Sequence, residues 1–186
     1  MTNEKKNILK LLSLCLAYPD AAALPEMEAA AAGLADPVAA ERLSHFMALV
    51  KARPLLELQE HYTAVFDMNP SASLNLTYHL MGDREDRGRA LAGLLEVYLR
   101  AGFEPAVNEL PDFLPLMLEF MAASPPAEPH ALIRRCLAAV PAVAGRLKES
   151  GSPYAVPLEL LCEVFPETAD LPLTPAGLAP AGASGA

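Results

Sequence analysis

The chain has 186 residues, is 53% hydrophobic, and carries 23 acidic against 14 basic residues, for a formal net charge of −9. This length indicates one domain, with or without a tail, and the apolar content is ample for a core. The acidic balance disfavours nucleic-acid binding, which usually relies on a basic patch, and better suits solubility or a basic partner. No uncharged run approaches the ~18 residues of a membrane span, so membrane insertion is not expected.

The N-terminal segment imitates a signal peptide, because Lys5 and Lys6 precede an apolar run. Lys10 interrupts that run, and the apolar residues around it follow helical spacing instead. These apolar residues are Ile8, Leu11, Leu12 and Cys15. We therefore expect a retained, amphipathic first helix over about residues 4–18, which Pro19 ends.

The rest of the sequence is organised as helices separated by proline and glycine. A short Ala-rich helix follows Pro25, and Asp36 is expected to cap a helix that begins at Pro37. Further helices are expected from Pro54 to about Phe66, over 74–80 after a loop at 67–73, from Asp83 or Arg84 to Arg100, from Asp112 through Met121, from Pro126 to about Leu147, and after Pro153. No convincing strand is present. The sequence therefore predicts an all-α fold, a single bundle of about eight helices over residues 1–168, followed by a flexible Pro/Ala/Gly-rich tail at 169–186.

The long helix that ends at Arg100 is expected to bury one stripe and contains one unusual glycine. The stripe comprises Leu91, Leu94, Leu95 and Tyr98. Gly102 should stop the helix. Gly88 lies inside it, where glycine costs up to ~1 kcal/mol relative to alanine. Close packing of another helix, or close approach of a ligand backbone, would explain this glycine.

The segment at 109–121 is apolar almost all the way round. Asp112 is expected to be the N-cap of its helix, and Pro115 lies in the first turn, where a missing N–H costs little. Only Glu119 is charged within the helix. Such a helix is either fully buried or presents one face to a partner.

Basic residues are absent from three stretches that contain several carboxylates. These stretches lie between Arg53 and Arg84, between Arg100 and Arg134, and after Lys148. They are either solvated helix faces or an anionic rim around an apolar surface.

No residue pattern nominates a catalytic or metal site. The four histidines lack metal-ligand spacing, and no nucleophile elbow or phosphate-binding loop is present. The three cysteines are far apart and are expected to be buried, reduced thiols. No catalytic residue, metal or stably bound cofactor is therefore predicted. A helical enzyme that uses Glu109, Asp112 or His79 is the less favoured alternative.

Several motifs occur together in a characteristic order. They are Leu-Cys-Leu-Ala-Tyr-Pro-Asp ending at Asp20, Tyr-Thr-Ala-Val-Phe-Asp at 62–67, His-Leu-Met-Gly-Asp-Arg-Glu-Asp-Arg-Gly-Arg-Ala at 79–90, and Glu-Leu-Pro-Asp-Phe-Leu-Pro-Leu-Met-Leu-Glu-Phe at 109–120. On these motifs, over about residues 10–165, the chain resembles the nitrate reductase molybdenum-cofactor assembly chaperones of the NarJ type. That group lies within the all-helical redox-enzyme maturation proteins.

This resemblance implies a cytoplasmic, non-catalytic chaperone. Its partner would be the N-terminal peptide of the catalytic subunit of a respiratory nitrate reductase, held until molybdopterin guanine dinucleotide is inserted and the complex assembles. Proteins of molybdenum-cofactor biosynthesis are further candidate partners. The alternative is a sister chaperone for a dimethyl-sulfoxide or trimethylamine-oxide reductase. The His-x-x-Gly…Asp-Arg-Gly segment favours the nitrate reductase group.

Peptide-binding residues are expected along the matching motifs, where an amphipathic helix would lie in an apolar groove. The candidates are Tyr62, Phe66, Asp67, His79, Arg87, Gly88, Leu91, Glu109, Leu110, Asp112, Phe113, Leu114, Met117, Glu119 and Phe120. For Tyr62 and Phe66, packing in the core is the alternative role. Asp67 is either a cap or the partner of a peptide cation. Arg87 pairs either with Asp67 or Asp112 in the fold, or with a peptide carboxylate.

Overall fold

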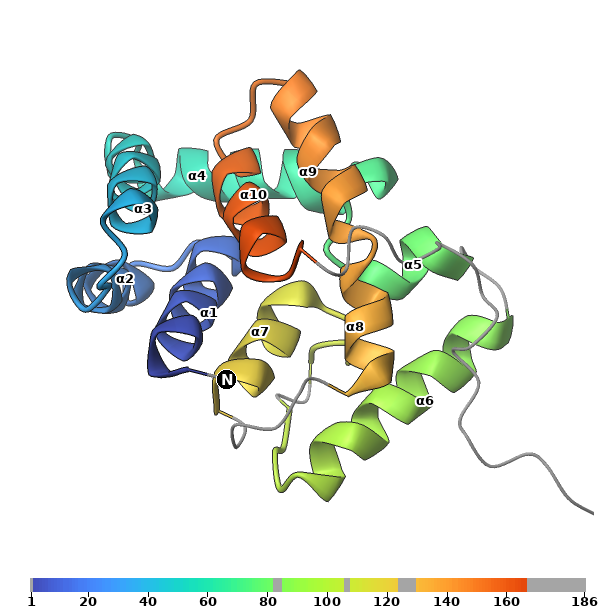
Figure 1. Cartoon of the computed structure of the whole chain (residues 1–186). Helices are drawn as coiled ribbons and strands as arrows, with labels where there is room; N and C mark the ends of the chain where they lie inside the picture. The colour runs from blue at the N-terminus through green and yellow to red at the C-terminus, as the bar shows by residue number, and fades with distance from the viewer. Residues whose placement is uncertain (1, 82–84, 106–107, 124–129, 167–186) are drawn as a thin grey trace, which may run out of the picture.

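A computed structural model describes residues 2–81, 85–105, 108–123 and 130–166, and within them every regular element is a helix (Figure 1). The predicted all-α fold is confirmed. The expected tail at 169–186 and the expected helix starts at Asp83 and Arg84 lie outside the described residues. None of the described helices is long and apolar enough to cross a membrane.

The helices follow one another through short connections. They are α1 (Asn3–Leu16), α2 (Ala23–Ala32), α3 (Pro37–Lys51), α4 (Leu55–Tyr62), α5 (Leu76–Met81), α6 (Glu85–Arg100), α7 (Leu114–Ala123), α8 (Ala131–Leu137), α9 (Val140–Glu149) and α10 (Ala155–Val164). A π-helical turn (Thr63–Asp67) extends α4, and a 3₁₀ turn (Pro70–Ala72) follows it before α5.

The start of α3 forms as its sequence predicts. The carboxylate of Asp36 accepts hydrogen bonds from the backbone N–H groups of Val38 and Ala39, and Pro37 occupies the first turn. These bonds satisfy donors that the helix itself leaves free. The residues spaced as a core stripe are all buried: Leu43, Phe46, Met47 and Val50. The cap and the stripe together fix which face of α3 meets the core.

The centre of the core is formed by α1 and α7, which lie side by side (Figure 1). Helix α1 buries Leu9, Leu12 and Leu16 completely. The hydroxyl of Ser13 donates to the carbonyl oxygen of Pro115 at 2.7 Å, which ties the two helices together through a buried bond. The expected first helix is thus a central element of the fold.

The structure shows that α7 is buried and does not present an apolar face to a partner. Its large apolar residues are buried on every side: Leu114, Pro115, Leu116, Met117, Leu118, Phe120 and Met121. Glu119 is its exposed charge. The expectation that Asp112 caps this helix is wrong, because α7 begins at Leu114 and the Asp112 carboxylate bonds to α5 instead.

The helix expected between Pro126 and Leu147 is divided into α8 and α9. Pro141 lies in the first turn of α9 and has no N–H to donate to the carbonyl of Leu137 four residues earlier. The chain bends at Ala138 and Ala139, both of which are buried. The proline could have predicted this division.

Helix α6 departs from its expected stripe. Its buried residues are Ala90, Leu94 and Tyr98, whereas Leu95 is 37% exposed and Leu91 is half-buried. Close helix packing does not explain Gly88, because a Cβ atom there would meet open space. Gly102 has a φ of +73°, which is the left-handed conformation that stops the helix as predicted.

All three cysteine thiols are free. Cys15 and Cys136 are buried as expected, but Cys162 is half-buried, so the expectation of burial is wrong for that thiol. Burial raises the pKa of the Cys136 thiol to about 12 and that of Cys162 to about 11, so both remain protonated and poorly reactive.

Candidate functional site

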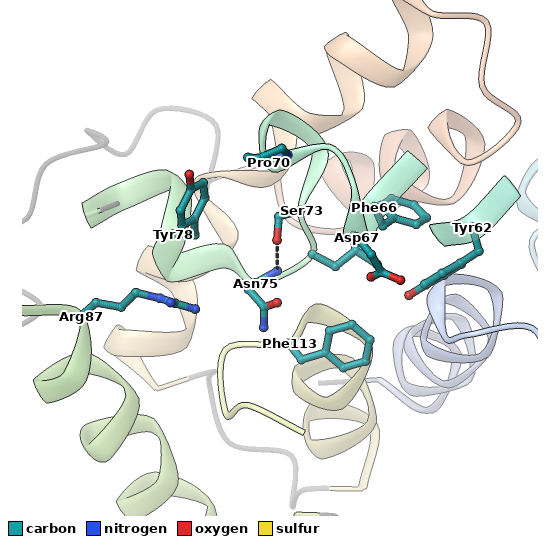
Figure 2. Close-up of a pocket in the computed structure, with 10 residues that line it drawn as sticks. Tyr62, Phe66, Asp67, Pro70, Ser73, Asn75, Tyr78, Arg87 and Phe113 are labelled. Atoms are coloured by element: carbon teal, nitrogen blue, oxygen red, sulfur yellow. Dashed lines mark hydrogen bonds between the residues drawn. The ribbon is translucent and has the colours of Figure 1, made fainter. Parts of the chain in front are cut away.

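An open pocket of about 360 Å³ lies where the π turn, the 3₁₀ turn, the start of α5 and the residue before α7 meet (Figure 2). Its lining comprises Tyr62, Phe66, Asp67, Pro70, Ser73, Leu74, Asn75, Tyr78, Arg87 and Phe113. These residues come from three of the family-like motifs, at 62–67, 79–90 and 109–120, and from the segment that joins the first two. We call this cavity the Asp67 pocket.

The π turn shapes one wall of the Asp67 pocket. The backbone N–H of Met68 donates to the carbonyl of Thr63, five residues earlier, at 2.9 Å. This wider turn buries the ring of Phe66 while the carboxylate of Asp67 remains exposed at the pocket. Single π turns of this kind often occur at functional sites.

A buried carboxylate holds the opposite wall in place. Asp112 is fully buried and accepts hydrogen bonds from Asn75 Nδ2 and from the backbone N–H of Thr77, both at 3.1 Å, and from the Thr77 hydroxyl. Arg87 forms an ion pair with Asp112 at 3.5 Å and donates from Nε to the Thr77 hydroxyl at 3.1 Å. These partners offset the cost of burying the charge, and Asp112 caps α5 from a distant part of the chain.

Backbone bonds join the segment between the 3₁₀ turn and α5 to the segment before α7. The N–H of Leu114 donates to the carbonyl of Leu74 at 2.9 Å, and the N–H of Leu76 donates to the carbonyl of Asp112 at 3.1 Å. His79 Nε2 lies 2.7 Å from the carbonyl oxygen of Ser73. Burial lowers the pKa of His79, which favours the neutral ring in this contact. The pocket therefore has a preformed floor.

An aromatic cluster supports the pocket from within the core. Tyr62 and Phe66 have ring centroids 4.8 Å apart, and Phe66 and Tyr154 have centroids 4.9 Å apart. The Tyr62 hydroxyl donates to the carbonyl oxygen of Leu16 at 2.9 Å. Burial, reinforced by the charge of Asp67, raises the pKa of Tyr62 well above its usual range, so the phenol stays neutral.

The charges of the Asp67 pocket are separated. Figure 2 shows Asp67 beside Tyr62 and Phe113 at one end, with Arg87 at the other. Asp67 forms no ion pair within the described residues, whereas Arg87 is already bound to Asp112. The open carboxylate beside a half-buried aromatic ring suits a cation carried next to an apolar group.

The fifteen candidate residues fall into four groups. Five line the pocket: Tyr62, Phe66, Asp67, Arg87 and Phe113. Two hold its walls: His79 and Asp112. Three are buried within the core and offer no surface: Leu114, Met117 and Phe120. The other five lie outside the lining: Gly88, Glu109, Leu110 and Glu119 are exposed, and Leu91 is half-buried. That any of these fifteen residues contacts a peptide remains a prediction.

Five lining residues were not anticipated from the sequence. They are Pro70, Ser73, Leu74, Asn75 and Tyr78. Only their position in the sequence could have identified them, because they occupy the loop and short helix that connect the motifs at 62–67 and 79–90. Within the described residues, no group of three His, Cys, Asp or Glu side chains is arranged to hold a metal ion.

Comparisons with known proteins agree with these motifs. The model of a protein family described as "Nitrate reductase delta subunit" matches residues 21–158. The "Probable nitrate reductase molybdenum cofactor assembly chaperone NarJ" of Bacillus subtilis (strain 168) is 34% identical over 163 residues, which cover 86% of this chain and 89% of that protein. The "Nitrate reductase molybdenum cofactor assembly chaperone NarJ" of Escherichia coli (strain K12) is 34% identical over 161 residues, which cover 84% of this chain and 68% of that protein.

A solved structure supports the fold. The crystal structure of a protein from Archaeoglobus fulgidus, described as a redox enzyme maturation protein, superposes with a TM-score of 0.63 at 24% identity. The match covers 85% of this chain and 91% of that one. At this identity the likeness concerns the fold alone.

Proposed function

The chain belongs to the nitrate reductase delta subunit family, and on that premise we propose that it is an assembly chaperone for the molybdenum cofactor of a nitrate reductase. Two relatives that the chain matches over most of its length carry that description. In this role it binds the N-terminal peptide of the apo catalytic subunit in the cytoplasm. It keeps that subunit competent for insertion of molybdopterin guanine dinucleotide, and it catalyses no reaction itself.

The observation that carries the peptide-binding part of the proposal is the Asp67 pocket. It is preformed, open and partly apolar, and Asp67 has no ion-pair partner in the described structure. An amphipathic peptide helix would place one apolar side chain against Phe113 and Phe66 and one cation beside Asp67. The buried helix α7 would support this surface without touching the peptide.

The negative charge of the chain also favours a basic peptide as the occupant of the Asp67 pocket. The chain has a net charge of −9, and Asp67 lies in a stretch with no Lys or Arg between Arg53 and Arg84. A basic peptide would therefore be attracted over a distance as well as at the contact, and added salt should weaken its binding. Apolar burial should supply most of the affinity and give a negative heat-capacity change.

Isothermal titration calorimetry with a synthetic N-terminal peptide of the catalytic subunit tests the proposal. Tyr62→Ala and Phe66→Ala are poor probes, because both rings are buried and their loss would disturb the core. Asp67→Asn is cleaner, since its carboxylate is exposed and unpaired in the described structure. We expect it to weaken binding about two- to fivefold, as for a solvent-accessible ion pair.

Glu119→Gln is the matched control, because this exposed carboxylate lies outside the pocket lining. It should leave the affinity unchanged apart from a small long-range effect. Phe113→Ala, at the half-buried ring of the pocket, should weaken binding more than Asp67→Asn does. Absence of heat at high peptide concentration, with a folded wild-type protein, would overturn the proposal.

A further inference from the structure

A second cavity, of about 250 Å³, opens between the end of α3, α4 and the turn before α10. It shares no lining residue with the Asp67 pocket. Leu49, Leu58, Pro153 and Tyr154 give it apolar walls, and Arg53 and His61 are its polar side chains. We call it the Arg53 cavity.

His61 lines this cavity, but its Nε2 atom is enclosed by protein. Its ring stacks on Tyr154, with centroids 5.9 Å apart and an interplanar angle of 18°. Its Nε2 atom is enclosed and has no hydrogen-bond partner within the described residues. The hydroxyl of Ser152, between two residues that border the cavity, is likewise buried without a partner. Both atoms have almost no accessible surface, so neither can contact a ligand in the open cavity unless the surrounding residues move.

Arg53 supplies a positive charge at the same place. No described carboxylate lies within ion-pairing distance of its guanidinium, whereas Arg42, Arg87 and Arg100 each pair with an acidic side chain. Burial, with the charge of Arg53 as a second cause, lowers the pKa of His61. The lowered pKa favours the neutral His61 ring, so Arg53 is the charged group among the residues that line the cavity.

The surroundings of Arg53 indicate a protein ligand rather than a small molecule. Leu49 on α3 is 43% exposed, and Leu56 at the start of α4 is 66% exposed. Leu49 lines the cavity, which is open and does not enclose its contents as a metabolite pocket would. A cation beside an exposed leucine matches a segment that carries an acidic residue beside an apolar one.

We propose that the Arg53 cavity binds an acidic side chain and a neighbouring leucine-like side chain of a protein partner. The carboxylate pairs with Arg53 beside the His61 ring. The apolar side chain packs on Leu49, Leu58 and Tyr154. Because the Asp67 pocket suits a basic segment, this second surface serves a different partner or a different segment, and it does not depend on the proposed function.

The test follows the His61 ring by NMR in the full-length protein during titration with N-acetyl-Leu-Asp-amide. N-acetyl-Leu-Asn-amide is the uncharged match, and N-acetyl-leucine supplies a small free acid. We expect the acidic dipeptide to shift the His61 signals at least fivefold more than the amide at equal concentration. Arg53→Gln should abolish that difference, and Arg100→Gln, on an exposed and separately paired guanidinium, should preserve it.

Three outcomes would overturn the proposal. Equal shifts from the acidic and amide dipeptides would show apolar contact alone, and no shift at millimolar concentrations would show that the cavity holds only water. A response to N-acetyl-leucine without one to the dipeptide would assign the cavity to small acids. Arg53 is exposed, so Arg53→Gln should fold normally, and unchanged binding of the nitrate reductase peptide would confirm this and separate the two sites.

Discussion

Helix α7 and the segment from Thr63 to Tyr78 are joined by a backbone bond between Leu114 and Leu74, yet they differ in composition and exposure. Helix α7 is regular and apolar, and it is buried from Leu114 to Met121 except at Glu119. The neighbouring segment contains a π turn and a 3₁₀ turn, and it exposes polar and aromatic side chains around a cavity. The strongest apolar pattern in the sequence thus marks the core, whereas the surface suited to a client lies where the backbone is irregular.

The largest expected effect is the loss of stability when a buried side chain of α7 is truncated, compared with truncation of an exposed side chain. Met117→Ala removes a fully buried side chain of α7 and should lower the free energy of unfolding by about 2–5 kcal/mol, because it leaves a cavity in the core. Leu110→Ala, at a side chain that is 45% exposed, is the control and should change stability by less than about 0.5 kcal/mol. Urea denaturation measures both. Equal effects would contradict the division between the buried helix α7 and the exposed segment that precedes it.

Asp112→Ala should lower the free energy of unfolding by about 1–3 kcal/mol, because the buried N–H of Thr77 and the side chain of Asn75 lose their acceptor. The same change should weaken peptide binding, since Asp112 holds the wall of the pocket rather than its surface. Glu109→Ala, an exposed carboxylate three residues earlier, should alter stability little. A stable Asp112→Ala protein with unchanged peptide affinity would show that the wall does not depend on this carboxylate.

The contrast between the carboxylates of Asp36 and Asp112 shows what can be predicted from the sequence. The cap at Asp36 and the stripe from Leu43 to Val50 were predictable, because each depends on residues within a few turns. The pairing of Asp112 with Arg87 was among the alternatives that the sequence left open, but its capping of α5 was not predictable, because that bond reaches Thr77, 35 residues away. Tyr62 and Phe66 were recognised by their motif, but their burial follows from packing against Leu16 and Tyr154, which no local pattern encodes.

A smaller effect concerns pH. Burial lowers the pKa of His79 below its ordinary value of 6.5, so the unfolded chain takes up a proton at higher pH than the folded protein does. Stability should therefore fall as pH decreases through about 6.5 toward the pKa of the folded state. His79→Gln should reduce the loss of melting temperature between about pH 7 and 5.5, while His45→Gln, at an exposed position, should retain it. Identical curves for all three proteins would contradict the burial of His79 as a cause.

The central claim is that the Asp67 pocket, and not α7 or the exposed chain around Leu110, contacts the client. Mapping of backbone amide chemical shifts during titration with the N-terminal peptide of the nitrate reductase catalytic subunit tests it most directly. We predict the largest changes at Phe66, Asp67, Asn75, Tyr78 and Phe113, with small changes along α7. Changes concentrated at Glu109, Leu110 and Glu119, with the pocket residues unmoved, would contradict the account.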